Sequence, residues 1–447
     1  MNISRDLFII FLYLFLDVVT VSLIFPWLPS LLEAFEQEQE WFYILCRRYI
    51  QQLGLILGVQ ENSLWDTVFL GGILSSSSSL AQFLSSPFAG ALSDLFGRKS
   101  VLVVLQVFLL LVNILWLCFG KSFLWLLISR ILCGAARANV GVISALVSDI
   151  SSNALRTKGM AVVGLAYGIG FTVGPPCSVI LLSRWNTSIT PEHLSFVLGC
   201  TCVFINCINL LILLLILPTP LQKRGDFNQS LTQALHLVNP VKLFSFSGTT
   251  RNPRDDRSLH RLACFWFAYL CVFCGIEYTL IFLARVRFNF TSADQSKMFG
   301  FVGILMMVVQ GGFIRRFRLG GEDNAITYGI CSLILASSIF SLSTSLFMFY
   351  IGLASYAFAS SIFFPSVNGL VSLYTTTEQQ GHTLGIFRSL NALARVLGAA
   401  FVTIAFWIFG PSICYLICAF FLALLFIHKK TIWKIYPLSQ EYTKLKK

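Results

Sequence analysis

Charged side chains are scarce in this sequence. Of its 447 residues only 12% are charged, with 32 Lys and Arg against 20 Asp and Glu, whereas a soluble domain carries about 25%. So few polar groups cannot cover the core of a water-soluble protein of this length. The composition therefore excludes a soluble enzyme, a nucleic-acid-binding protein, a secreted disulfide scaffold and a disordered chain.

Several kinds of functional site are also absent from the sequence. The five histidines are scattered without metal-ligand spacing, and no glycine-rich phosphate-binding loop with its lysine is found. The apolar segments contain no nucleophile–base constellation either. We therefore expect no metal, no cofactor, no ATP-driven transport and no enzymatic activity.

Long apolar segments are abundant. Hydrophobic residues make up 56% of the chain and the mean hydropathy is +0.78, as in a polytopic α-helical membrane protein. Short polar breaks divide these segments into twelve predicted transmembrane helices. Their expected ranges are 7–32, 67–89, 101–120, 123–147, 159–182, 196–217, 262–284, 298–314, 325–344, 346–371, 383–408 and 411–428.

The longest polar stretch, 218–261, separates the sixth span from the seventh. It predicts a cytosolic linker between two six-helix halves, 1–217 and 262–428, which a basic cytosolic tail, 429–447, follows. The predicted fold class is therefore an all-α membrane protein with twelve transmembrane helices in two six-helix halves.

The distribution of basic residues predicts the orientation. With both termini in the cytosol, 21 Lys and Arg fall in cytosolic segments and seven in outer segments, as the positive-inside rule requires. Most of the net charge of +12 then lies against anionic lipid, and not against nucleic acid. We expect a multi-pass protein of the plasma membrane or an internal membrane.

The loop between spans 2 and 3 reads Gly90-Ala-Leu-Ser-Asp94-Leu-Phe-Gly97-Arg98-Lys99. Gly97 permits a sharp turn or a positive φ, and Asp94 can accept from free N–H groups at a neighbouring helix N-terminus. Arg98 can pair with a carboxylate at the cytosolic end of another span. The segment resembles the signature loop of the major facilitator superfamily, Gly-x-x-x-Asp-x-x-Gly-Arg-Arg/Lys.

Asp149 ends span 4 on the same side of the membrane and is the expected partner of Arg98. The resemblance implies a conformational lock that holds the cytosolic ends of the first half together and against span 11. The alternative is an ordinary polar loop whose basic residues follow the positive-inside rule. A second-half copy of the loop, around Arg315 and Arg316, lacks the acidic residue.

Span 4 carries polar residues in an apolar run. Arg130-Ile-Leu-Cys-Gly134 resembles the superfamily's Arg-x-x-x-Gly motif in this span, and Arg137 and Asn139 follow. An arginine inside hydrocarbon is costly unless it meets a partner or a wet cavity. Arg130 can snorkel to the outer surface, so structural pairing and cavity lining both stay open for it. Arg137 is too central for that, and we expect it in a cavity or a buried pair.

Span 5 is rich in glycine, with Gly164, Gly168, Gly170 and Gly174 before Pro175. Small residues four apart let helix backbones approach closely, and the proline pair is expected to bend or break the span. The segment resembles the Gly-x-x-x-Gly-Pro motif of proton-coupled antiporters in the superfamily. That pattern usually ends in paired glycines, where this chain has serine and valine, and simple helix packing is the alternative.

Two acids lie inside predicted spans, Asp17 in span 1 and Glu277 in span 7, which correspond in a six-plus-six repeat. A lone carboxyl group in hydrocarbon favours its neutral form, and a nearby arginine favours the charged form. A group that switches between these forms suits proton coupling. The alternative is a neutral carboxyl group bonded to a neighbouring helix.

Span 11 carries Arg388, Asn391 and Arg395 at spacings of three and four, which place them on one helix face. Arg395 lies roughly 18 Å from the cytosolic end of its span, too far to snorkel to a surface. Two guanidinium groups on one stripe predict an anionic substrate or a carboxylate from another span. Gln82 in span 2 and Gln310 in span 8 are further candidates for the cavity.

Narrower segments extend the resemblance along essentially the whole chain. They are similar to the tetracycline-transporter-like family among the drug:proton antiporters of the superfamily. This resemblance implies an organic anion or an amphipathic drug-like compound as the substrate. The segments are Arg156–Gly164, Gly275–Thr279, Lys297–Phe299, Gln310–Gly311, Gly320–Glu322 and Arg388–Arg395.

The sequence therefore predicts a monomeric secondary transporter that moves a small organic solute by alternating access, coupled to protons as an antiporter. Its expected partners are the bilayer, the solute and protons. A non-transporting sensor or scaffold on the same fold is the alternative, and a passive channel without proton dependence is a third option. Asn186, in Asn-Thr-Ser, is the expected glycosylation site on the outer side.

Overall fold

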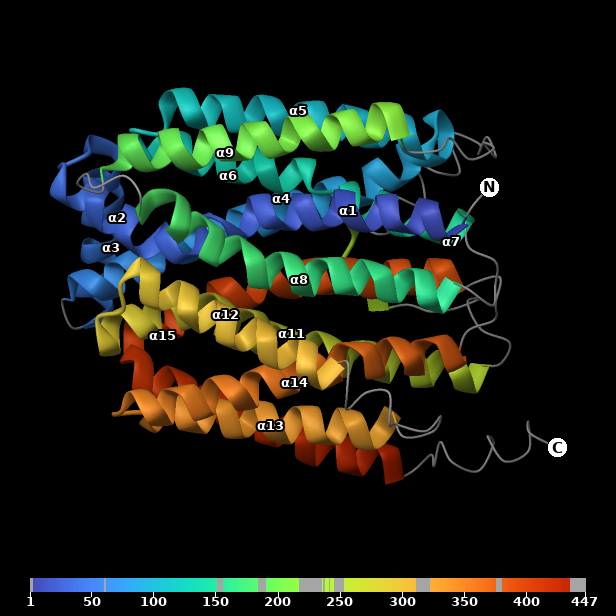
Figure 1. Ribbon diagram of the computed structural model, residues 1–447. Coiled ribbons are helices and arrows are strands. Elements are labelled where there is room, and N and C mark those ends of the chain that lie inside the picture. The colour runs from blue at the N-terminus through green and yellow to red at the C-terminus, as the bar shows by residue number, and fades with distance from the viewer. Residues whose placement is uncertain are drawn as a thin grey trace.

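Figure 1 shows the computed structural model of the chain. The structure describes residues 3–59, 62–150, 156–183, 190–216, 235, 238–240, 242–244, 253–310, 322–374 and 380–434. Asn186, most of the expected linker, the loop around Arg315 and the tail beyond 434 lie outside these residues.

The described residues are helical throughout their regular elements and contain no strand. The first half contains α1 (Ile3–Ser22), α2 (Leu28–Gln37), α3 (Trp41–Leu57), α4 (Ser63–Phe96), α5 (Arg98–Phe119), α6 (Phe123–Ala136), α7 (Asn139–Ile150), α8 (Arg156–Ser183) and α9 (Pro191–Leu211). The second half contains α11 (Pro253–Phe288), α12 (Ser292–Val308), α13 (Glu322–Leu342), α14 (Leu346–Tyr374) and α15 (Gln380–Lys434).

Twelve membrane spans can be assigned to these helices. Within the described residues, ten helical stretches are long and apolar enough to cross a membrane. One of them, Gly385–Lys429, is two spans, because Gly410 adopts a left-handed φ of 74° before Pro411 and divides α15. The 17-residue helix α12 is the remaining span. The predicted all-α, twelve-span architecture is confirmed.

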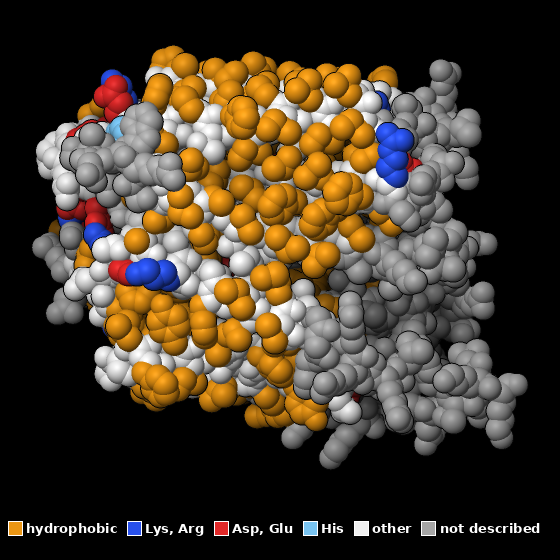
Figure 2. Space-filling model, in the orientation of Figure 1, with side chains coloured by type: hydrophobic (Ala, Val, Ile, Leu, Met, Phe, Trp, Pro, Cys, Tyr) orange, Lys and Arg blue, Asp and Glu red, His pale blue; other side chains and the backbone are white. Residues whose placement is uncertain are grey.

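The helices run side by side along one direction (Figure 1). Helix α1 begins and α15 ends at the same end of the bundle, here called the terminal end, whereas α2 and α3 lie at the opposite end, here called the α3 end. Figure 2 shows hydrophobic side chains covering the visible flank, with charged side chains near the two ends. A flank of this kind suits the hydrocarbon of a bilayer.

Helix α3 was not among the predicted elements, which include no helix between 32 and 67. Glu40 accepts from the Tyr43 amide at its start (2.7 Å), and Gly58, with φ 67°, ends it. One face is buried against the bundle. The opposite face is exposed and mostly apolar, as in helices that lie in a membrane interface. The large apolar side chains exposed along α3 are Trp41, Leu45, Tyr49, Leu53, Leu55, Ile56 and Leu57.

Span 4, predicted as one helix over 123–147, is broken into α6 and α7 at Arg137 and Ala138. The break leaves backbone carbonyls without helical partners, and side chains of α4 supply donors. Ser85 Oγ donates to the Ala135 carbonyl (2.9 Å) and Gln82 Nε2 to the Arg137 carbonyl (3.3 Å). Irregular backbone at membrane depth is stable only where protein or water satisfies it in this way.

Other boundaries differ from the prediction without changing the number of spans. Helix α11 begins at Pro253, inside the segment expected to be linker, and α15 continues to Lys434, inside the segment expected to be tail. Helix α8 passes through Pro175 and Pro176 without ending. A break in span 5 is therefore absent, although the two prolines cannot donate helical N–H bonds to the carbonyls four residues before them.

The two halves pack against each other mainly through α8 with α12 and α4 with α15. Small residues make these approaches close. A Cβ atom on Gly303 would lie 1.9 Å from Thr172 Oγ1, and one on Gly72 would lie 2.3 Å from Thr403 Oγ1. Within the first half, Gly134 of α6 faces the backbone of α4, where a Cβ atom would lie 2.0 Å from the Ser78 carbonyl oxygen.

Gly134→Ala is expected to lower the thermal stability of the purified protein, because the Ser78 backbone cannot rotate away from the new methyl group. Gly141→Ala on α7 is the matched control, since nothing lies within 4 Å of its added Cβ atom. At an unobstructed helical position, replacing glycine by alanine raises the free energy of unfolding by about 0.4–1 kcal/mol. The midpoint of thermal unfolding in detergent measures both. Equal midpoints for the two variants would contradict the close packing of α4 and α6.

Candidate functional site

The site begins with a close crossing of α11 and α15. A Cβ atom on Gly398 would lie 2.2 Å from the Cys271 carbonyl oxygen, and one on Gly275 would lie 2.2 Å from Val402. The two helices therefore touch backbone to backbone in mid-span. This crossing sets the acid of α11 and the arginine of α15 opposite each other.

Arg395 Nη2 lies 4.0 Å from Glu277 Oε2. The two side chains are 42% and 39% exposed although both stand in the middle of a span. Arg395 also acts electrostatically on Tyr167 of α8, in the other half of the molecule. The pair therefore stands in mid-span with part of its surface exposed.

The other polar residues of span 11 lie on the same helix, α15. Arg388 is a second cation that acts on Tyr167. The Oδ1 atom of Asn391 is buried and has no hydrogen-bond partner among the described residues. Tyr356 of α14 is within electrostatic range of both Arg395 and Glu277.

The first half contributes the second acid. Asp17 is fully buried, and neither of its oxygens has a hydrogen-bond partner within the described residues. Arg137, at the break between α6 and α7, is the cation that acts on it. Tyr167 interacts with Asp17 and Arg137 as well as with Arg395. The same tyrosine is thus within electrostatic range of Asp17 and Arg137 in the first half and of Arg395 in the second.

For four predicted site residues the described contacts do not involve the pair of Arg395 and Glu277. Asn139 is buried inside the first half, where its Nδ2 donates to Tyr13 (3.1 Å). Gln82 is engaged with the broken helix, and Gln310 ends the described part of the segment after α12. The Arg130 guanidinium lies over the Trp116 ring, 5.1 Å from its centroid. That contact is a cation–π pair inside the first half.

The glycines of span 5 divide into two groups. Gly170 and Gly174 face α1, where Cβ atoms would lie 2.8 Å from Val18 and 1.9 Å from Ser22 Oγ. Gly164 and Gly168 face open space, with nothing within 4 Å of an added Cβ atom. The first pair therefore packs helices.

The lock residues lie at the terminal end. Arg98 Nη1 lies 2.5 Å from Asp94 Oδ1, and its Nε lies 3.1 Å from Asp149 Oδ2. Gly97, with φ 93°, makes the turn that brings them together, and Lys99 Nζ donates to the Leu214 carbonyl (3.1 Å). Each of these contacts joins elements of the first half. Gly90, in the same loop, has open space around it.

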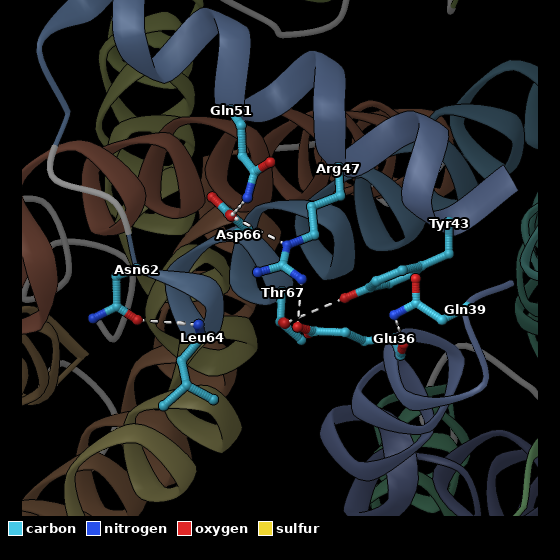
Figure 3. A network of polar contacts seen from close by, with 9 residues as sticks. All are labelled: Glu36, Gln39, Tyr43, Arg47, Gln51, Asn62, Leu64, Asp66 and Thr67. Carbon is cyan, nitrogen blue, oxygen red and sulfur yellow. Dashed lines mark hydrogen bonds and ion pairs between the residues drawn. The ribbon is translucent and has the colours of Figure 1, made fainter. Parts of the chain in front are cut away.

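The α3 end carries a polar network that the sequence did not reveal (Figure 3). Arg47 of α3 contacts both Glu36 and Asp66, at 3.5 Å from Asp66 Oδ2. Asp66 Oδ1 accepts from Trp407 Nε1 of α15 at 3.0 Å. The network therefore continues from the first half into the second.

A second contact joins the halves at this end. Arg285 Nε donates to Glu33 Oε1 at 2.8 Å, and its Nη2 to Oε2 at 2.5 Å. Ser296 of α12 donates to the Pro175 carbonyl at 3.0 Å. Only the acidic and basic character of these segments was visible in the sequence, since the partners are far apart along the chain.

The model of the Major Facilitator Superfamily matches residues 10–399. Major facilitator superfamily domain-containing protein 10 of Mus musculus is 33% identical over 439 residues, covering 96% of this chain and 93% of the relative. The Bos taurus protein of the same name is 34% identical over 93% of this chain and 90% of its own length. The class C tetracycline resistance protein of Escherichia coli is 25% identical, covering 82% and 91%.

The crystal structure of the human organic anion transporter MFSD10 superposes with a TM-score of 0.79 at 31% identity, covering 96% of this chain and 99% of that chain. The xylose transporter XylE of E. coli, at a TM-score of 0.68 and 15% identity over 97% and 98%, shares the fold. With twelve apolar spans in the architecture of transporters, this chain belongs to the Major Facilitator Superfamily, whose members are transporters and not enzymes.

Proposed function

We propose that this protein is a secondary active transporter of a small organic anion or an amphipathic drug-like compound, driven by alternating access and coupled to protons. The observation that carries the proposal is the accessible pair of Arg395 and Glu277 in mid-span, 4.0 Å apart. We assign the terminal end of the bundle to the cytosol, because the basic residues of the sequence gather in the segments on that side. The contacts that join the halves at the α3 end then fit a state that is closed toward the outside.

The balance of charge around Tyr167 favours an anion. Arg137, Arg388 and Arg395 act on this tyrosine, together with Asp17 as its acid neighbour. A guanidinium fork matches the planar geometry of a carboxylate, and a charge interacts strongly in a water-poor site. The human relative of known structure is an organic anion transporter, which supports the same substrate class.

An anion can enter by replacing Glu277 at Arg395. A distance of 4.0 Å is longer than a direct hydrogen bond, so the guanidinium keeps donors for another partner. When the anion takes Arg395, Glu277 is left without its cation, so a proton can replace the guanidinium as its partner. One arginine thereby links the charge of the substrate to the movement of a proton.

Two considerations bear on the direction of proton movement relative to the anion, and they favour opposite directions. Kinship with the tetracycline resistance protein favours antiport. If the anion displaces Glu277 from Arg395, anion binding at Arg395 and proton binding at Glu277 favour each other. This coupling favours symport, in which the proton and the anion cross the membrane in the same direction. An imposed pH gradient across proteoliposomes separates these directions. A scaffold accumulates nothing under either gradient, and a channel shows no response to it.

Arg395→Lys is expected to weaken anion binding by about 1–3 kcal/mol, because the charge stays but the planar fork is lost. Arg395→Ala should weaken anion binding by more than Arg395→Lys does, since it removes the charge and also leaves Glu277 without its cation. Uptake of a labelled organic anion and thermal shifts with the same anion measure the effect. Arg48→Lys on the exposed face of α3 is the control. Normal uptake by Arg395→Ala would refute the role of this arginine.

Glu277→Gln and Asp17→Asn test the proton step. At least one of them should abolish the dependence of transport on a pH gradient while anion exchange at equal pH continues, because a neutral amide cannot release a proton. Glu38→Gln, at an exposed acid of the α3 end, is the control. If both variants kept the full dependence of transport on the pH gradient, proton coupling through these two acids would be refuted.

Asp94→Asn is expected to impair transport more than the amount of protein at the membrane, because Arg98 would keep only Asp149 as a charged partner. Glu192→Gln, which removes the exposed pair with Lys121 at the α3 end, is the matched control. The ratio of initial uptake rate to surface protein is the quantity to compare. A ratio equal to that of the control would show that the loop is only structural.

A further inference from the structure

Helix α3 lies across the ends of neighbouring membrane spans. Near its start, Tyr43 packs edge-on against Phe123, the first residue of α6, with 5.4 Å between the ring centroids. In its middle, Arg47 and Gln51 point toward Asp66, the fourth residue of α4 (Figure 3). Both contacts fall in about the first turn of a span, so α3 lies at the level where the spans reach the membrane surface.

The last part of α3 contacts the second half. Trp407 of α15 lies three residues before the turn at Gly410. A Cβ atom on Gly54 would lie 3.3 Å from Trp407 Cζ2, and Trp407 Nε1 donates to Asp66 Oδ1 at 3.0 Å. The ring of Phe69 in α4 lies 5.0 Å from the Trp407 ring. Trp407, only 3% exposed, therefore sits in a socket of Gly54, Asp66 and Phe69, here called the Trp407 socket.

The opposite face of α3 is an apolar stripe, here called the α3 stripe. Its members stand at spacings of four, four, four and three residues, which place them on one side of the helix. They are exposed by 39% to 81%, and they are Trp41, Leu45, Tyr49, Leu53 and Ile56. On the other side of the helix, Tyr43, Ile50 and Gly54 are buried. One helix thus presents one face to the protein and an apolar face to its surroundings.

The bilayer is the partner that fits the α3 stripe, because the stripe continues a surface that already faces lipid. Exposed apolar side chains of neighbouring spans reach the same level, among them Trp125 near the start of α6 and Phe409 beside the turn of α15. Tryptophan and tyrosine, both present in the stripe, are favoured at the level of the headgroups. Arg48 is exposed next to the stripe, and a guanidinium matches the geometry of a lipid phosphate.

We propose that α3 is an interfacial strap, in which the α3 stripe lies in the outer leaflet of the bilayer while the buried face of α3 closes the Trp407 socket. Parting the halves at this end withdraws Trp407 from the socket and breaks its contacts with α3 and Asp66. A stripe anchored in lipid keeps α3 over the socket, since moving it into water exposes apolar surface. The bilayer thereby favours the state that is closed at the α3 end. The gate rests on the proposed alternating access, whereas the seat of the stripe in lipid does not.

The fluorescence of Trp41 tests whether the stripe lies in lipid. Phospholipids with brominated acyl chains quench tryptophan on contact, so the quenched part of the emission from proteoliposomes should fall in Trp41→Phe. Trp266→Phe is the matched control, because Trp266 is 3% exposed inside the second half and should contribute no quenched emission. If iodide in the outer solution quenched Trp41 and the brominated lipid did not, the stripe would face water or a protein, and the strap would be overturned.

Trp407→Phe tests the socket, because it removes the N–H donor and keeps an aromatic ring. Spin labels carried by genetically encoded residues at positions 192 and 297 report the separation of the halves. Both positions are exposed at the α3 end, one in α9 and one in α12. The population with the longer distance should rise about tenfold, the effect of losing one hydrogen bond to a carboxylate. An unchanged distribution of distances would overturn the socket as a gate.

Leu53→Gln combined with Ile56→Gln tests the anchoring in lipid. In proteoliposomes this double variant should also raise the longer-distance population, because the stripe then holds α3 less firmly in the bilayer. Leu346→Gln combined with Phe347→Gln is the matched control. These residues are 51% and 78% exposed at the start of α14, which contributes nothing to the socket. Equal distributions of distances in the two double variants would overturn the coupling of lipid to the gate.

Neither the fluorescence nor the distance measurement needs a substrate. A protein that moves no anion but shows the quenching of Trp41 and both shifts in distance would refute the proposed function and support the strap. If no variant showed a longer-distance population, the gate would be overturned together with alternating access.

Discussion

A charge inside a bilayer must find a partner within the protein, because hydrocarbon supplies none. The arrangement of the helices follows this requirement closely. Arg130 lies over the Trp116 ring, and Arg395 lies beside Glu277 across a close helix crossing. Asp17 is buried where Arg137 can act on it. Each of these contacts joins two helices, so the placement of a few charges restricts how the whole bundle can pack.

The backbone obeys the same requirement at the break in span 4. A helix that ends in mid-membrane exposes carbonyl groups, and here Gln82 and Ser85 of α4 satisfy them. Those side chains reach the break because Gly134 lets α6 lie against the backbone of α4. The break in turn frees Asn139 to begin α7 and to face Tyr13. A small residue at one position thus brings the donors of α4 within reach of the broken helix.

The sequence predicted the features that repeat or lie close together along the chain. Twelve apolar segments and the spacing of Arg388, Asn391 and Arg395 on one face are of this kind. The sequence could not predict contacts between helices far apart in the chain, such as Tyr13 with Gln106, because they leave no local pattern. Helix α3 was missed because its apolar stripe is shorter than a span and is interrupted by polar residues. The break in span 4 was missed because its residues are all compatible with a helix.

The pairs at the ends of the bundle resemble the central pair in exposure but differ from it in their surroundings. Asp149 is 46% exposed in its pair with Arg98, and Arg395 and Glu277 are 42% and 39% exposed in theirs. An ion pair at the end of a span meets bulk water and contributes only about 0–1 kcal/mol. In mid-span hydrocarbon supplies no partner, so a guanidinium that separates from its carboxylate needs water or another anion within the protein. Under the proposed mechanism, the occupancy of the central pair would therefore govern when the ends are free to open.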